Sequence, residues 1–145
     1  MKKREIKFRS LSNNYSVIIG NNILGYLNKR IKLLCPKTKK VAVIFDKNVP
    51  QKFRTILKKE LKNYHLIFFS FNSSEKSKNF NTINFFLNKL VINSFNRSDL
   101  LIGLGGGITG DVVIHDRMQT AGYENYIVRD CVTYHFVRGE SKDIQ

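Results

Sequence analysis

A glycine-rich turn is the feature of this sequence best suited to binding a ligand. An apolar run at residues 100–104 is followed directly by three glycines, Gly105 to Gly107, and then by Gly110 and Asp111. Glycine has no Cβ and lets the backbone come close to a bound group. A helix that begins at such a turn offers N–H groups and a positive dipole end to a phosphate or pyrophosphate. The alternative is a tight strand-to-helix turn without a ligand, since such a motif means little outside a βαβ unit.

Asp46 is a second candidate, because it directly follows the apolar run at residues 41–45. An acidic residue at the end of a strand can accept hydrogen bonds from a ribose diol, as in dinucleotide sites. Alternatively, Asp46 or Asn48 caps a helix that begins near Pro50. The position of Asp46 does not decide between the two.

Three further charged residues can each be interpreted either as part of a ligand site or as structural. Glu75 and Lys78 lie three residues apart before a predicted helix. They can bind ribose or phosphate, or they can form an i,i+3 ion pair in a solvated first turn. Asp111 either lines a cofactor pocket beside the glycine turn or favours the helix N-terminus electrostatically.

The elements that would position these residues alternate between strand and helix. Apolar runs and helical spacings predict strands at 41–45, 66–71 and 100–104, separated by helices at 50–61 and 80–91. An antiparallel strand pair at 6–10 and 15–19 and a helix at 23–34 precede them. This order predicts the α/β class, with a Rossmann-like parallel sheet flanked by helices and an N-terminal β-hairpin-like pair. Asp46, the 73–78 loop and the glycine turn would share the carboxyl edge, where ligands bind in such sheets.

Composition narrows the classes of partner and compartment. The chain has 145 residues and a formal charge of +14, with 21 Lys and Arg against 5 Asp and Glu up to Gly110. The lysines are scattered over predicted helix surfaces, so we expect no nucleic-acid partner. No apolar run approaches the roughly 18 residues that span a bilayer, so we expect no membrane association. Two distant cysteines without a Cys-x-x-Cys pair predict a reducing, cytoplasmic setting.

Four segments resemble a known family in order and spacing. They are Tyr15-Ser-Val-Ile-Ile-Gly20, Val43-Ile-Phe-Asp-Lys-Asn-Val49, Glu75-Lys-Ser-Lys78 and Leu104-Gly-Gly-Gly-Ile-Thr-Gly-Asp111. Together they resemble the amino-terminal domain of 3-dehydroquinate synthase, over roughly residues 6–113. Gly-Gly-Gly-x-x-Gly-Asp is typical of the sugar-phosphate cyclases, whereas related iron-containing alcohol and glycerol dehydrogenases usually have serine after the glycines.

The resemblance implies an NAD site in this part of the chain. The pyrophosphate would lie on the glycine turn, with Gly105, Gly106, Gly107, Gly110 and Asp111 around it, and Asp46, Glu75 and Lys78 would serve the ribose and nearby groups. The family converts 3-deoxy-D-arabino-heptulosonate 7-phosphate to 3-dehydroquinate and phosphate in the shikimate pathway of aromatic amino acid biosynthesis, a lyase reaction. Its complete members use NAD and a divalent metal, zinc or cobalt, and the resemblance implies a homodimer.

The resemblance ends shortly after Asp111. The family continues with an Arg-Gly pair, a Thr-Thr segment and catalytic lysines, and a helical domain supplies one Glu and two His to the metal; residues 114–123 do not match. We therefore expect residues 1–113 to form the NAD-binding domain and residues 114–145 an unassigned tail, unrelated or frameshifted, with a strand near 126–132. The helical metal-binding domain, the metal ligands and the catalytic residues would be absent, and the isolated chain inactive.

Two other functions remain open at this point. The chain can be a fragment of a related metal-dependent alcohol or glycerol dehydrogenase, although a serine after the triple glycine would favour that family and Thr109 is not equivalent to it. It can also be a non-enzymatic basic binding domain, which its charge of +14 permits.

Overall fold

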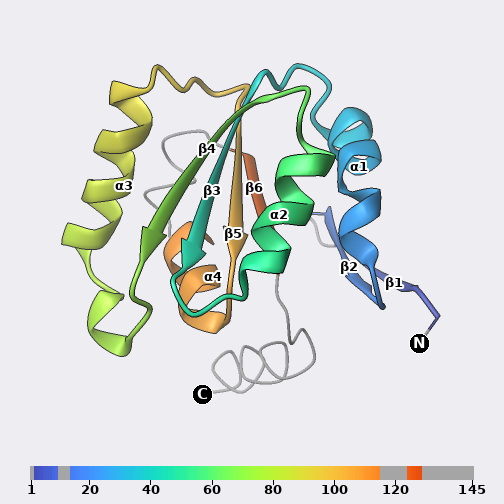
Figure 1. The fold of residues 1–145 in the computed structure, drawn as a ribbon, viewed down its shortest axis with the longest axis horizontal. Helices are drawn as coiled ribbons and strands as arrows, with labels where there is room; N and C mark the ends of the chain where they lie inside the picture. The colour runs from blue at the N-terminus through green and yellow to red at the C-terminus, as the bar shows by residue number, and fades with distance from the viewer. Residues whose placement is uncertain (1, 10–13, 115–123, 129–145) are drawn as a thin grey trace.

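A parallel sheet of four strands forms the centre of the fold (Figure 1). The structure, a computed structural model, describes residues 2–9, 14–114 and 124–128. The strands are β3 (Lys40–Asp46), β4 (His65–Phe71), β5 (Leu100–Leu104) and β6 (Glu124–Val128), in the order β4-β3-β5-β6. All neighbours are parallel, and Val41 pairs with both Leu66 and Leu100. The predicted Rossmann-like sheet is confirmed.

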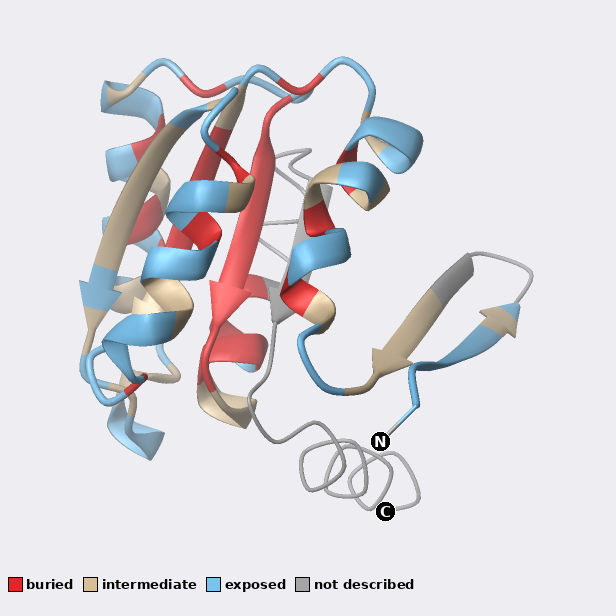
Figure 2. Cartoon of the chain, turned by 45° about the vertical axis from the view of Figure 1, so that its right-hand side comes forward, coloured by how far each residue is buried: buried red, intermediate tan, exposed pale blue. Residues whose placement is uncertain are grey.

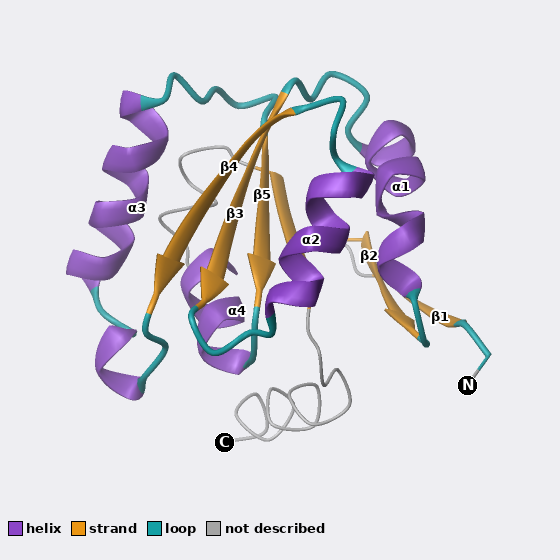
Figure 3. Cartoon of the chain, in the orientation of Figure 1, coloured by secondary structure: helices purple, strands orange, loops and turns teal. Residues whose placement is uncertain are grey.

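Helices cover both faces of this sheet (Figure 3). The short 3-10 helix η1 (Ile23–Tyr26), α1 (Leu27–Leu34) and α2 (Gln51–Glu60) pack on one face, while α3 (Phe80–Ile92) and α4 (Gly107–Ile114) pack on the other. A second 3-10 helix, η2 (Glu75–Ser77), lies between β4 and α3 in the chain. Among the described residues, no helix has both the length and the apolar character needed to cross a bilayer.

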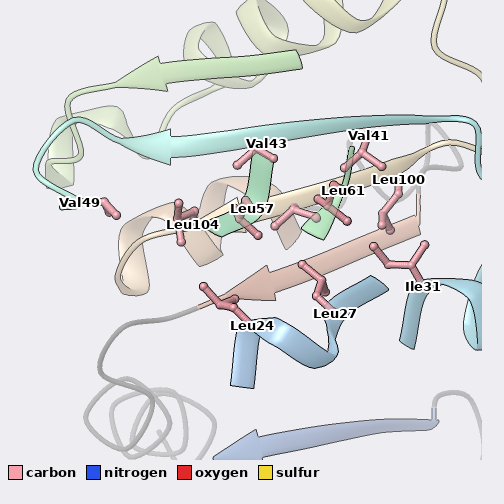
Figure 4. Packing of buried hydrophobic residues seen from close by; sticks show 11 residues of the cluster. Leu24, Leu27, Ile31, Val41, Val43, Val49, Leu57, Leu61, Leu100 and Leu104 are labelled. Carbon is pink, nitrogen blue, oxygen red and sulfur yellow. The ribbon is translucent and has the colours of Figure 1, made fainter. Parts of the chain in front are cut away.

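The core has two parts because side chains alternate across the sheet, and β5 in its middle is buried along its whole length (Figure 2). On the α1 and α2 face, Val41 and Val43 of β3 belong to a cluster that includes Ile31 of α1 and Leu57 of α2 (Figure 4). On the other face, Ile44 belongs to a cluster with Phe86 of α3 and Val113 of α4. Burial on both faces explains why residues 41–45 form an uninterrupted apolar run.

The N-terminal strands form a separate two-stranded sheet, as predicted. β1 (Arg4–Arg9) and β2 (Asn14–Ile19) are antiparallel, with Ile6 opposite Val17. Arg30 of α1 holds this hairpin: its Nη2 lies 3.1 Å from Glu5 Oε1 and donates to Ser16 Oγ at 2.9 Å. The hairpin is therefore tied to the main domain through polar contacts of one helix.

The structure refines two predictions from the sequence. The helix predicted at 23–34 begins as the 3-10 helix η1 and becomes α-helical at Leu27. The strand predicted near 126–132 is β6, which pairs with β5 and starts at Glu124. A boundary at residue 113 and an unrelated tail stay predictions, because residues 115–123 and 129–145 lie outside the described part.

Candidate functional site

The glycine turn lies at the carboxyl end of β5, in the centre of the sheet. Leu104, the last residue of β5, is buried, and α4 begins at Gly107 after a two-residue bend. The Gly110 N–H donates to the Gly106 carbonyl at 3.1 Å, so Gly106 already accepts the first hydrogen bond of the helix. A strand, a short bend and a helix N-terminus thus follow one another, the arrangement that presents backbone N–H groups to an anion.

Gly105 packs too tightly for any side chain. A Cβ built there would collide with Thr109 Oγ1 and would lie 3.0 Å from Thr109 Cβ and 3.3 Å from Asp46 Cβ. Glycine is therefore required by the close approach of this bend to α4 and to the end of β3. The same packing brings Asp46 next to the turn, as predicted from the sheet topology.

The carboxylate of Asp46 joins two loops at the sheet edge. Its Oδ1 accepts a hydrogen bond from the Asn48 N–H at 2.9 Å, and its Oδ2 accepts one from the Ser73 hydroxyl. The N-cap of α2 is Pro50, with no side-chain cap, so neither Asp46 nor Asn48 caps this helix. The capping alternative is wrong, and Asp46 instead orients the loops that follow β3 and β4.

Lys78 is the centre of a charged cluster that contains three of the predicted site residues. Its Nζ lies 2.8 Å from Asp111 Oδ2 and 3.3 Å from Glu75 Oε2. The Lys78 side chain is 25% exposed, against 66% for Glu75 and 48% for Asp111. The i,i+3 pair considered from the sequence is present, and the shorter contact with Asp111 ties η2 to α4. Both carboxylates keep oxygen surface that can accept hydrogen bonds from hydroxyl groups.

A cavity of about 400 Å³ adjoins this cluster. Its walls are Lys78, Asn79, Phe80, Ile83, Asp111 and Val112. This volume lies within the roughly 300–1,000 Å³ of typical small-molecule sites. The N-terminal end of α3 is ordered beside it, because the Asn79 side chain caps α3 by accepting from the Thr82 N–H at 2.9 Å.

Two polar residues at this edge were missed from the sequence. Ser73 donates to Asp46, and Thr109 is 0% exposed, with an Oγ1 that has no hydrogen-bond partner among the described residues. The position of Thr109 within the glycine motif was a signal that its side chain faces the turn; nothing in the sequence marks Ser73 apart from the serine beside it. Within the described part of the chain, no three His, Cys, Asp or Glu side chains gather as metal ligands.

Comparisons with known proteins agree with the resemblance seen in the motifs. Residues 68–117 match the family model described as 3-dehydroquinate synthase N-terminal. The 3-dehydroquinate synthase of Pelagibacter ubique is 41% identical over 108 residues, which are 74% of this chain and 29% of that protein. That of Clostridium acetobutylicum is 34% identical over 102 residues, 69% of this chain and 28% of that protein. The chain thus spans less than a third of the length of these relatives.

Solved structures show the same fold. A crystal structure of 2-deoxy-scyllo-inosose synthase has a TM-score of 0.73 and 19% identity, over 88% of this chain and 36% of that one. A second structure of a 2-deoxy-scyllo-inosose synthase, complexed with carbaglucose-6-phosphate, NAD⁺ and Co²⁺, has the same TM-score and identity and is covered over 34% of its length. Over its matched part, the chain is therefore similar to the amino-terminal domain of 3-dehydroquinate synthases.

Proposed function

We propose that this chain is the NAD-binding part of a 3-dehydroquinate synthase, with the NAD pyrophosphate on the Gly105–Gly107 turn. The proposal rests on the observation that three loops come together at one edge of the sheet. Gly105 packs against Asp46, and Lys78 bridges to Asp111 of α4, so the loops after β3, β4 and β5 meet around the glycine turn. Ligands bind at this edge in open parallel sheets. The neighbour solved with NAD⁺ has the same fold.

The turn would hold the pyrophosphate through its backbone. Gly106 and Gly107 lead into α4, whose N-terminal N–H groups and dipole suit a diphosphate. The Gly110 N–H is already bonded to the Gly106 carbonyl, so Gly110 would serve by leaving room rather than by donating. The absence of a side chain at Gly106 would allow the diphosphate to reach the backbone.

Carboxylates around the turn would receive the hydroxyl groups of the dinucleotide. Each oxygen of Asp46 accepts one hydrogen bond within the protein and keeps a lone pair for a ribose hydroxyl. Ser73 and the Asn48 N–H fix the orientation of this carboxylate. Glu75 and Asp111 would act similarly. Lys78 lies between them, and its positive charge would offset the electrostatic repulsion between the two carboxylates and the diphosphate.

For the complete protein we propose the family reaction, 3-deoxy-D-arabino-heptulosonate 7-phosphate to 3-dehydroquinate and phosphate. NAD would supply transient oxidation of a substrate hydroxyl, and a divalent metal, zinc or cobalt, would polarise reacting oxygens. The present chain would bind and orient the dinucleotide. The phosphate-bearing substrate, a homodimer and a cytoplasmic setting belong to the same proposal, and purified chain should release no phosphate from the substrate.

A calorimetric titration of the purified chain with NAD tests the site. Replacing Lys78 by Gln removes the ammonium group that contacts the Glu75 and Asp111 carboxylates. We expect this K78Q variant to bind NAD roughly tenfold more weakly, or worse, which corresponds to about 1.4 kcal/mol. The matched control is Lys76→Gln, an exposed lysine of η2 two residues before Lys78, with less than about a twofold effect expected. Equal affinities of the two variants, both folded by circular dichroism, would argue against the proposed site.

A further inference from the structure

A second cavity lies on the α2 face of the sheet and is lined mainly by cationic and aromatic side chains. It has a volume of about 410 Å³, and we call it the α2 groove; its walls are Phe45, Lys47, Arg54, Lys58, Phe68 and Ser70. Phe45 and Phe68 pack against the core cluster of the α1 and α2 face, whereas Val112, beside the Lys78 cluster, belongs to the cluster of the other face. The groove and the glycine-turn site therefore lie on opposite faces of the sheet.

Aromatic rings hold two of the three cations in place. The guanidinium carbon of Arg54 lies 4.5 Å from the centre of the Phe45 ring, and Lys58 Nζ lies 5.5 Å from that of Phe68. The two rings meet edge to face, 6.0 Å apart. Arg54 and Lys58 are four residues apart on α2 and so project from the same side of the helix. A guanidinium that lies over an aromatic ring can still donate N–H hydrogen bonds to an anion.

No carboxylate neutralises these cations within the described part of the chain. The ion pairs found there are those of Arg30 and Lys78, and none includes Lys47, Arg54 or Lys58. Asp46 adjoins Lys47 in sequence, but its oxygens accept from Asn48 and Ser73. Glu60 of α2 is not among the residues that line the groove. Three positive charges around one concave surface favour an anionic occupant.

We propose that the α2 groove binds the phosphoryl group of a small ligand, separately from the NAD site. Arginine matches two phosphate oxygens with its forked N–H groups, and two ammonium groups add charge and donors for a dianion. Ser70 adds a hydroxyl donor near the end of β4. The groove lies towards the carboxyl end of β3 and β4, the side of a parallel sheet where ligands bind.

The test is a titration of the full, ¹⁵N-labelled chain by NMR at low ionic strength, where screening is small. Inorganic phosphate and glycerol 3-phosphate are the probes, and malonate is a dicarboxylate for comparison. We expect saturable shifts of the Lys47, Arg54 and Ser70 amides with both phosphates, and binding of malonate weaker by roughly threefold or more. Tighter binding of glycerol 3-phosphate would identify an ester as the ligand, and tighter binding of inorganic phosphate a free ion.

Variants distinguish specific phosphate binding in the α2 groove from nonspecific attraction to surface charge. The double variant R54Q/K58Q should bind phosphate roughly tenfold more weakly, or worse, while Lys59→Gln, an exposed neighbour outside the groove, should change affinity by less than about twofold. Equal losses in the two, no loss in the double variant, or malonate binding as tightly as phosphate would overturn the proposal. Gly106→Val should leave these shifts intact; their disappearance in that folded variant would place the phosphate at the glycine turn instead.

Discussion

Replacing Gly105 by Ala probes the packing on which the candidate site depends. The added methyl group would collide with Thr109 Oγ1 and lie 3.0 Å from Thr109 Cβ and 3.3 Å from Asp46 Cβ. Thr109 is fully buried, and Asp46 is held by Ser73 and by the Asn48 N–H, so neither neighbour can move away easily. Overpacking of this kind typically costs about 1–3 kcal/mol, and we expect G105A to lower the free energy of unfolding by that amount.

Urea unfolding followed by circular dichroism measures this loss. The midpoint should fall while the slope with denaturant stays the same, because the folded and unfolded states keep their compactness. Gly25 of η1 is the matched control, since a Cβ there meets nothing within 4 Å. We expect Gly25→Ala to be neutral or to stabilise by up to about 1 kcal/mol, because alanine restricts the unfolded chain.

A second variant identifies the colliding atom. Thr109→Ala removes the Oγ1 that the new methyl group would meet, so the double variant G105A/T109A should recover part of the stability lost in G105A. A coupling of roughly 0.5–3 kcal/mol is usual for residues in contact. If G105A unfolds at the same urea concentration as G25A, the bend is looser than described, and Asp46 does not adjoin it as we argue.

Two further predictions concern one partly buried and one fully buried polar side chain. Burial, and secondarily the charge of Cys35, raises the pKa of Tyr64 above its usual value. The unfolded chain then ionises first, so this stabilisation is complete below about pH 10 and is lost as the pH rises through the folded pKa. Tyr64→Phe should therefore flatten the fall in urea midpoint between about pH 9 and 11, and an unchanged fall would contradict the assignment. Asp99, 1% exposed, accepts from the N–H groups of Lys40 and Asn96, each at 2.9 Å. Asp99→Asn should lower the free energy of unfolding by about 1–3 kcal/mol in urea titrations, because one of these N–H groups would face an amide NH₂; a change within error would show that the carboxylate is not needed.

Much of the fold could be predicted because its buried apolar residues recur with the spacing typical of strands and helices. Residues 41–45 of β3 are all apolar, since both faces of this strand are covered. The helical spacing of apolar residues within 80–91 predicts α3, whose buried side is Ile83, Phe86 and Leu90, while Phe80 and Val91 are exposed. The start of η1 as a 3-10 helix could not be predicted, because 3-10 and α-helical turns share similar apolar spacing over one turn.

The site was predicted in outline but not in its contacts. Sheet topology alone places Asp46 and the glycine turn at one edge, as the structure confirms. The bond from Lys78 to Asp111 depends on how α4 lies against η2, which no local pattern encodes. The α2 groove was missed for the same reason: Arg54 and Lys58 resemble other exposed helix charges until Phe45 and Phe68 are placed beneath them.

The most direct test of the account is an NMR titration of the labelled chain with NAD. We predict that the largest shifts fall on the amides of Gly106, Gly107 and Asp46, next to the end of β5 and the start of α4. The Gly106→Val variant, whose side chain would block the approach of the diphosphate, should lose these shifts while remaining folded. Shifts confined to residues away from this turn, or equal NAD affinity in the wild type and the variant, would contradict the claim that the glycine turn carries the pyrophosphate.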